Sequence, residues 1–148
     1  MAGEGYQHIL VPLDGSKLSH AALDGALPIA TAVGARLTLA AVVDPILCQS
    51  FESFAAAENI SVIEAVENYL SGVQAELIDD GYDVDTRVKA ATGYTVAERL
   101  IEMADEIEAD LIALSTHGRS GVEKALFGSV ATAVLRESPF PVLVFPQG

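Results

Sequence analysis

The sequence predicts an α/β fold, with five parallel strands in one sheet and helices on both faces. Apolar runs of strand length alternate with helical patterns five times along the chain, which is typical of strand–helix–strand units. The chain of 148 residues has the size of one ordinary domain, and no linker-like stretch divides it, so we expect residues 1–148 to form one domain. Ligands of such sheets bind beyond the carboxyl ends of the strands, where the strand order reverses.

The first strand is predicted over Tyr6 to Val11, and a turn with a carboxylate follows it. Pro12 ends the strand because proline cannot donate to the ladder. The turn Pro12-Leu13-Asp14-Gly15-Ser16 places Asp14 at the carboxyl end of the strand. We expect Asp14 either to meet a ligand there or only to cap the turn or the next helix.

A helix and a second strand follow that turn. Ser16 or Ser19 is expected to cap the helix. Pro28 is expected to interrupt the helix because it removes one backbone hydrogen bond, and Gly34 is expected to end it. The segment Arg36 to Val43 is rich in apolar and β-branched residues and predicts a buried strand.

The stretch from Ile46 to Asn59 has no clear hydrophobic period, and two interpretations stay open. It is either a loop with a short helical turn that packs over the mouth of the site, or a surface insertion whose two Phe residues fill a local gap. The capping-box pattern Ser61-x-x-Glu64 then predicts a helix that ends at Asp79-Asp80-Gly81. Its apolar face is predicted to consist of Ile63, Val66, Leu70, Val73 and Leu77.

The third strand is expected at an edge of the sheet. The segment Asp83 to Lys89 alternates between uncharged residues and charges, as a half-exposed strand does, and the charges discourage pairing with other chains. A second capping-box pattern, Thr95-x-x-Glu98, opens the following helix. The apolar face of that helix is predicted from Val96, Leu100, Met103 or Ala104, and Ile107.

The run from Leu111 to Val130 carries the motif on which the functional prediction depends. Leu111 to Leu114 predicts a buried strand that opens into a loop rich in glycine and hydroxyl side chains, and a helix is predicted from Ser129 to about Arg136. Glycine permits positive φ and a close approach of the backbone, and the N-terminus of a helix attracts anions, so the loop suits phosphate. The P-loop spacing and the dinucleotide fingerprint Gly-x-Gly-x-x-Gly do not occur.

The spacing Ser115-x2-Gly118-x9-Gly128-Ser129 resembles the ATP-binding signature of the universal stress protein family, Gly-x2-Gly-x9-Gly-Ser/Thr. The sequence THGRSG at 116–121 and the segment Pro-x-Asp-Gly-Ser at 12–16 are similar to that family as well. Ser115 departs from the signature because it stands in place of the first glycine. The substitution would cost about 1 kcal/mol if that backbone needed a positive φ.

The resemblance covers essentially the whole chain and implies a Rossmann-like fold of the adenine nucleotide alpha hydrolase type, with strand order 3-2-1-4-5. It also implies an adenine nucleotide as ligand, namely ATP, ADP or AMP, with or without Mg²⁺ or Mn²⁺. Asp14 and the backbone of Val42 are expected on the nucleoside side, and the glycine loop on the phosphate side. The implied site residues are Pro12, Leu13, Asp14, Val42, Ser115, His117, Gly118, Arg119, Ser120, Gly128, Ser129 and Val130.

Catalytic machinery is not evident beside the expected phosphate site. Glu123 is the only carboxylate of the loop, whereas ATP hydrolysis needs a positioned water and charge stabilisation. We therefore expect a sensor or regulator that hydrolyses ATP slowly or not at all and that can act on a regulatory protein partner. Two alternatives stay open: a family member that binds no nucleotide and acts through dimerisation, and a slow phosphohydrolase or flavin carrier on a similar fold.

The last strand, Val142 to Phe145, is apolar throughout and is expected at the other edge of the sheet. A bare apolar edge promotes aggregation, whereas pairing with its copy in a second subunit would bury it. The family resemblance implies dimerisation through the same strand. We therefore expect a homodimer built on Val142 to Phe145.

Composition narrows the partners and the compartment. The net charge is −13 with only eight Lys and Arg residues, which argues against nucleic-acid binding because phosphate neutralisation needs a basic face. No apolar run reaches the roughly 18 residues of a membrane span, and the first residues do not have the pattern of a signal peptide. A single cysteine, Cys48, excludes an internal disulfide, so we expect a cytoplasmic protein.

Overall fold

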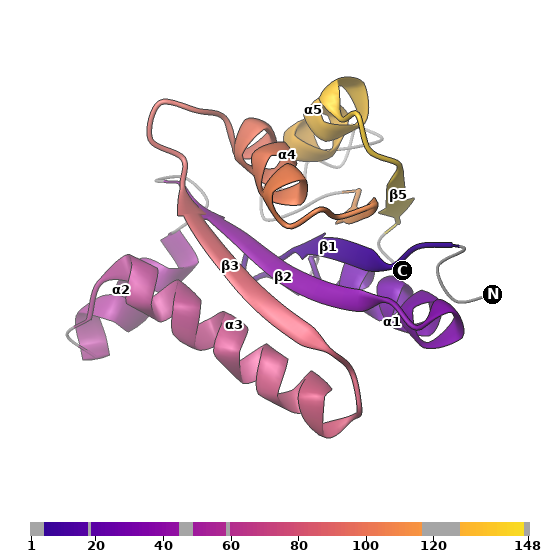
Figure 1. Ribbon diagram of the computed structural model, residues 1–148. Coiled ribbons are helices and arrows are strands. Elements are labelled where there is room, and N and C mark those ends of the chain that lie inside the picture. The colour runs from indigo at the N-terminus through magenta and orange to yellow at the C-terminus, as the bar shows by residue number, and fades with distance from the viewer. Residues whose placement is uncertain (1–4, 18, 45–48, 59, 117–127, 147–148) are drawn as a thin grey trace.

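The computed structural model of the chain describes residues 5–17, 19–44, 49–58, 60–116 and 128–146. Within them, parallel strands form one sheet in the order β3-β2-β1-β4-β5 (Figure 1), which confirms the predicted order. β3 and β5 therefore lie at the two edges. The strands are β1 (His8–Pro12), β2 (Arg36–Val43), β3 (Val84–Ala90), β4 (Leu111–Ser115) and β5 (Val142–Phe145).

Helices cover both faces of the sheet, as predicted (Figure 1). One face carries α1 (His20–Val33), α2 (Gln49–Glu58) and α3 (Val62–Asp79). The other carries α4 (Val96–Glu106) and α5 (Ser129–Glu137). The crossovers after β1 and β4 thus leave the sheet toward opposite faces.

Alternation along the strands builds the two halves of the core. Ile9 on β1 lies beside Leu37 and Leu111, and all three pack in the cluster under α1 and α3. Leu10 and Ile112, the next residues along their strands, pack in the cluster under α4 and α5. Successive side chains of a strand point to opposite faces, so strands that are covered on both faces need to be almost wholly apolar.

β1 begins and ends later than the sequence predicts. The Asp110 carboxylate accepts the N–H groups of Gln7 at 2.8 Å and His8 at 3.1 Å, so the strand starts at His8. Pro12 belongs to the strand and lies beside Ala40 of β2. The sheet does not need a donor from Pro12 at this point, because the N–H group of the next residue, Leu13, bonds to the Ala40 carbonyl at 2.8 Å. Proline is tolerated at this strand end for that reason.

The prediction that Pro28 interrupts α1 is wrong, because the helix is continuous from His20 to Val33. Proline removes one i to i−4 hydrogen bond, here the one to the Asp24 carbonyl. Asp24 and Pro28 are both exposed, so water can satisfy that carbonyl. Gly34 ends the helix in the left-handed conformation, with φ 72°, as predicted.

The other helices largely follow the predicted faces. The capping box of Ser61 and Glu64 is present at the start of α3, and Thr95 caps α4 by accepting the Glu98 N–H at 3.1 Å. Ile63 is an exception at 45% exposed, because Ala65 and Val66 supply the first buried turn of α3. Within the described ranges, we find no helix with the length and apolar content that a membrane crossing requires.

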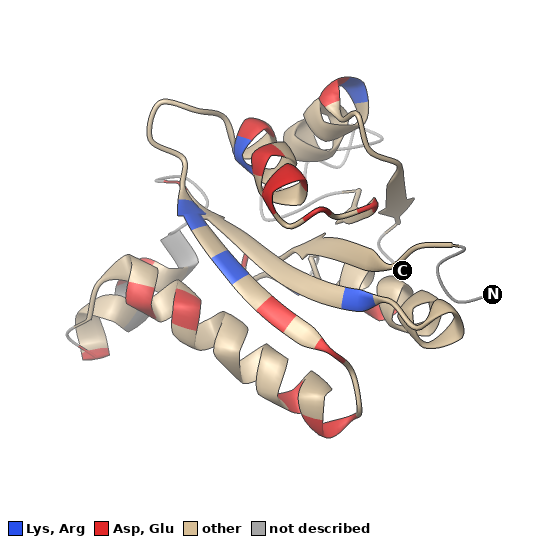
Figure 2. Cartoon of the chain, in the orientation of Figure 1, with Lys and Arg blue, Asp and Glu red and all other residues tan. Residues whose placement is uncertain are grey.

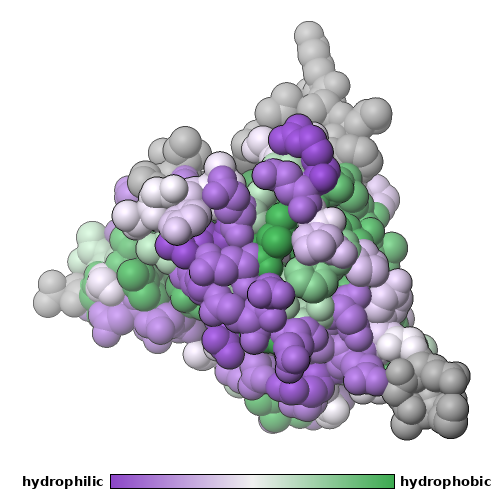
Figure 3. Space-filling model, turned by 45° about the horizontal axis from the view of Figure 1, so that its top comes forward, coloured by the Kyte–Doolittle hydropathy of each residue, from purple (hydrophilic) through white to green (hydrophobic). Residues whose placement is uncertain are grey.

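The edge strand β3 is half-exposed, as its alternation predicts. Val84 is buried, whereas Asp85 and Arg87 are exposed. Lys89 bridges β3 to α4 by ion pairs with Glu102 at 3.1 Å and with Glu106. Figure 2 shows Lys or Arg residues on β3 and Asp or Glu residues on α4, and Figure 3 shows hydrophilic residues over much of the face in view.

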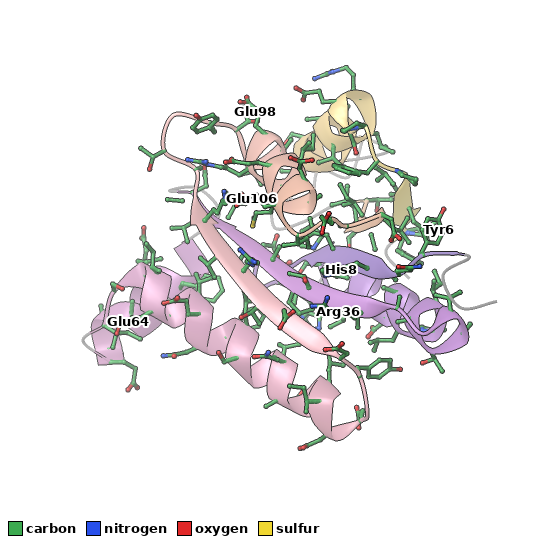
Figure 4. All side chains as sticks on the ribbon, viewed as in Figure 1. Tyr6, His8, Arg36, Glu64, Glu98 and Glu106 are labelled. Atoms are coloured by element: carbon green, nitrogen blue, oxygen red, sulfur yellow. The ribbon has the colours of Figure 1, made fainter. Side chains whose placement is uncertain are left out.

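His8 joins three elements below the covering helix α4. Its side chain is only 8% exposed, and Nε2 lies 2.6 Å from Thr38 Oγ1 on β2. The Ile107 backbone, at the end of α4, acts to raise the pKa of the ring. His8, Thr38 and Ile107 line a pocket of about 290 Å³, together with Arg36, Asp85, Thr86 and Arg87 (His8 and Arg36 are labelled in Figure 4).

Burial, followed by the positive charge of Arg36, lowers the pKa of His8 below its ordinary value of 6.5, although Asp85 and Asp110 oppose the shift. The unfolded chain then binds the proton more readily than the folded one, so His8 contributes stability above pH 6.5 that is lost as the pH falls.

We expect unfolding in urea to show a larger loss of stability between about pH 7.5 and pH 5.5 in the natural protein than in His8→Gln, which cannot titrate. The difference between the two proteins removes the contribution of the carboxylates, which both share. Equal losses in the two proteins would contradict the assignment.

Gly25 on α1 makes room for the last residue of β5. A Cβ on Gly25 would overlap the Phe145 ring, whereas a Cβ on Gly72, in the exposed middle of α3, would meet nothing within 4 Å. We expect Gly25→Ala to lower the free energy of unfolding by about 1–3 kcal/mol through this overlap. Gly72→Ala should raise it by about 0.5–1 kcal/mol, because alanine favours the helix. Urea unfolding measures both, and equal effects of the two substitutions would be inconsistent with the packing of Phe145.

Candidate functional site

The strand order places the switch point, where open α/β sheets have their ligand crevice, beyond the carboxyl ends of β1 and β4. We call this place the crevice. These two strands are neighbours in the sheet. The chain leaves β1 for α1 on one face and returns to the other face in α5 after β4. This is the switch point at which open α/β sheets bind ligands.

The turn after β1 is held by its own side chains. Asp14 Oδ1 accepts the Ser16 N–H at 2.9 Å and the Ser16 hydroxyl at 2.5 Å. Ser19 Oγ donates to the Ser16 carbonyl at 2.9 Å. Gly15 between them has φ 85°, a conformation that favours glycine. Asp14 therefore caps the turn, which confirms the structural role considered for it, and Ser19 occupies the N-cap position of α1 without a side-chain cap bond.

Ser115 joins β4 to α1, a role that the signature did not predict. Its hydroxyl accepts the Ala22 N–H at 3.1 Å and donates to the Ser19 carbonyl at 3.2 Å. Among the described residues other than glycine, only Glu108 has a positive φ, so Ser115 has an ordinary backbone conformation. The expected cost of replacing glycine does not arise, and the hydroxyl instead fixes the first turn of α1 against the end of β4.

The two ends of the glycine loop meet between β4 and α5. The Thr116 carbonyl accepts the Gly128 N–H, and the Thr116 N–H donates to the Phe145 carbonyl at 2.9 Å. Gly128 is the N-cap of α5 and offers its first-turn N–H groups no side-chain oxygen. Ser129, the first residue of α5, is exposed. The N-terminus of α5 thus begins beside the end of β4 at the crevice.

The structure brings most of the described site residues to this crevice. Leu13 is buried in the core, so only its backbone can face a ligand. Val42 lies at the end of β2, 8% exposed in the cluster under α4 and α5, and the role expected for its backbone stays a prediction. Four predicted residues lie outside the described residues: His117, Gly118, Arg119 and Ser120. The described members are Pro12, Leu13, Asp14, Val42, Ser115, Gly128, Ser129 and Val130.

Two further polar residues near the turn, His20 and Tyr69, belong to no motif in the sequence. His20 is half-buried, and its Nε2 lies 2.7 Å from the Tyr69 hydroxyl on α3. Burial, followed by the charge of Asp14, raises the pKa of Tyr69 to about 12, so the hydroxyl stays protonated. The two residues are far apart along the chain, and no local pattern announces the contact.

The prediction for the segment Ile46 to Asn59 needs correction in one respect. It holds a regular helix, α2 (Gln49–Glu58), instead of a loop with a short turn. Phe51 is half-buried and packs against the core cluster under α1 and α3, while Cys48 lies outside the described residues. No group of three or more His, Cys, Asp or Glu side chains with the spacing of a metal site occurs in the described part of the chain.

Comparison with known proteins identifies the family. A sequence profile of the universal stress protein family matches residues 5–146. A universal stress protein of Staphylococcus aureus strain USA300 is 31% identical over 140 residues, which cover 94% of this chain and 83% of that protein. A universal stress family structure from Burkholderia pseudomallei shares 32% identity with a TM-score of 0.71, over 98% of this chain and 99% of that one. A universal stress protein solved in complex with cAMP shares 28% identity with a TM-score of 0.66, over 97% and 98%. The chain belongs to the universal stress protein family.

Proposed function

We propose that this protein binds an adenine nucleotide, ATP in the first place, in the crevice between the Asp14 turn and the N-terminus of α5. The observation that carries the proposal is the link made by Ser115, which ties the end of β4 to the first turn of α1. The carboxylate turn follows β1, and the glycine-capped N-terminus of α5 is joined to the end of β4 by the bond from the Gly128 N–H to the Thr116 carbonyl. The solved relative in complex with cAMP supports the ligand class.

The two sides of the crevice suit the two ends of a nucleotide. The turn with Asp14, together with the backbone of Val42, would take the nucleoside. The first turn of α5 at Ser129 and Val130, together with the loop from His117 to Ser120, would take the phosphates, because free N–H groups and the helix dipole favour anions. An Mg²⁺ or Mn²⁺ ion that arrives with the triphosphate would neutralise part of its charge.

Regulation fits the described crevice better than efficient catalysis. Asp14 Oδ1 is engaged by Ser16, and a general base has to reach the proton that it abstracts. We therefore propose a sensor or regulator that signals through its bound nucleotide, in the cytoplasm, with at most slow ATP hydrolysis. A regulatory protein partner would recognise the nucleotide-bound state.

We also propose a homodimer through β5. β5 forms the edge of the described sheet, and Leu143 on it is 36% exposed. Apolar side chains on an open strand edge favour pairing with a second copy in a symmetric dimer.

Nucleotide binding is tested by thermal unfolding with ATP, ADP and AMP. ATP at about 100 times its dissociation constant should add about 2.7 kcal/mol to the stability of the natural protein. Ser129→Asp should remove this shift because it places a negative charge where the phosphates would lie. The same charge should stabilise the nucleotide-free protein by about 0.3–1 kcal/mol through the helix dipole, so loss of the shift cannot be ascribed to unfolding.

The control is Ser129→Asn, which has a similar shape without the charge and should keep most of the shift. A full ATP shift in Ser129→Asp would place the phosphates elsewhere. The absence of a shift with all three nucleotides in the natural protein would refute nucleotide binding.

The dimer is tested by light scattering after size-exclusion chromatography. Leu143→Asp should convert the dimer to a monomer, because a buried carboxylate in the new strand pair would lack a partner. Ile78→Asp is the matched control, since Ile78 is 51% exposed on α3, away from β5. A dimer that persists in Leu143→Asp, or one that is lost equally in both variants, would count against the β5 interface.

A further inference from the structure

Helix α2 brings an aromatic side chain onto the turn that carries Asp14. α2 follows β2 in the chain and lies at the carboxyl ends of the strands, next to the start of α3 (Figure 1). A Cβ placed on Gly15 would lie 2.7 Å from Phe51 Cζ and 3.0 Å from Phe51 Cε2. The ring therefore sits in direct contact with the Gly15 backbone, and no larger residue could occupy that position without moving it.

Phe51 belongs to an aromatic cluster that spans three helices. Its ring centroid lies 5.6 Å from that of Tyr69 on α3, with the planes tilted by 59°. Tyr69 in turn meets His20 of α1 edge-on, at 6.3 Å between centroids, and shares a hydrogen bond with it. Aromatic pairs at such distances stabilise one another beyond the area that they bury. The ring on Gly15 is thus anchored from α2, α3 and α1 together.

The Phe51 ring meets the turn at the residue that is costliest to order. Gly15 adopts φ 85°, and glycine loses more conformational freedom on ordering than any other residue. Asp14 hydrogen-bonds to Ser16 and Ser19, which follow Gly15 in the chain. The Phe51 ring adds an apolar contact from a different element, which restricts Gly15 before any ligand arrives.

We propose that Phe51 is a positioning residue for the nucleoside side of the site, and that α2 thereby sets the affinity for the nucleoside part of the ligand. This inference rests on the proposed nucleotide binding. Phe51 acts through the turn: it holds the Gly15 backbone, and the Gly15 backbone fixes the direction of the neighbouring Asp14. A turn that is ordered before binding raises affinity, because binding then loses less conformational entropy.

The test compares ATP with inorganic triphosphate, which has the phosphates without the nucleoside. Phe51→Ala should weaken ATP about tenfold, the equivalent of about 1.4 kcal/mol, and should change triphosphate affinity by less than about twofold. Phe51→Leu keeps an apolar contact and should restore most of the ATP affinity. Ile63→Ala, on the exposed side of α3, is the control and should leave both affinities unchanged. Isothermal titration measures the four proteins against both ligands.

A second measurement is independent of nucleotide. Gly15→Ala places its methyl group against the Phe51 ring, so urea unfolding should show that this substitution costs less in a Phe51→Ala background than in the natural protein. Additive costs would mean that the ring does not bear on Gly15 in solution and would overturn the inference.

The remaining outcomes separate this inference from the proposed function. An unchanged ATP affinity in Phe51→Ala, or an equal loss for ATP and triphosphate, would overturn the positioning role while leaving nucleotide binding intact. A natural protein that binds no ATP, ADP or AMP would overturn the proposed function, and the positioning role with it, whatever the result for Gly15.

Discussion

The pairing of β1 with both β2 and β4 is the constraint on which the rest of the site depends. At its start, β1 is fixed by the Asp110 carboxylate, which takes the N–H groups of Gln7 and His8. At its end, Leu13 N–H still bonds to the Ala40 carbonyl of β2. The Asp14 turn therefore begins at a defined point, next to the end of β4, and the crossovers to opposite faces leave a crevice there. A shift of β1 by one residue would reverse its two faces and move the turn with them.

The fold could be predicted because local pattern and tertiary burial agree along most of the chain. Strands such as Arg36 to Val43 are apolar on both faces, and β3 alternates because only one of its faces is covered. The predictions that were wrong concern residues whose exposure to solvent the sequence pattern does not reveal. Pro28 is tolerated in α1 because the carbonyl it leaves unbonded is on the exposed side, and Ile63 is exposed although its spacing matches the buried face. Neither fact is visible in a periodicity.

The site could be predicted only where a motif is contiguous in the sequence. The turn with Asp14 and the start of α5 could be proposed as parts of the site because their residue types and spacing are local. The contacts of Ser115 with Ala22, of Tyr69 with His20 and of Phe51 with Gly15 each join segments that are distant in the sequence. They depend on how the helices lie on the sheet, and residue types alone do not encode that packing. α2 is the clearest example of such a contact. Its sequence has no hydrophobic period, and the role proposed for it depends on the single ring of Phe51.

Two helix N-termini face the crevice, and their hydrogen bonds indicate which of them is suited to phosphate. The start of α1 is already engaged: the Ser19 N–H bonds to Ser16 Oγ at 3.3 Å, and the His20 N–H to the Lys17 carbonyl at 3.2 Å. Ala22 N–H is engaged by Ser115. Gly128, by contrast, caps α5 without a side chain, and its φ of −68° is open to any residue.

The glycine at position 128 is therefore not explained by a left-handed backbone. Gly128 is buried, and its N–H bonds to the Thr116 carbonyl. This close, buried packing favours a residue without a side chain. The hydroxyl of Ser115 accepts a hydrogen bond from the Ala22 N–H of α1. Without this bond, the N–H group would be free to attract an anion at the same crevice. In the proposed mode of binding, the departure from the glycine signature thus makes α1 a weaker competitor for phosphate and leaves α5 as the favoured end.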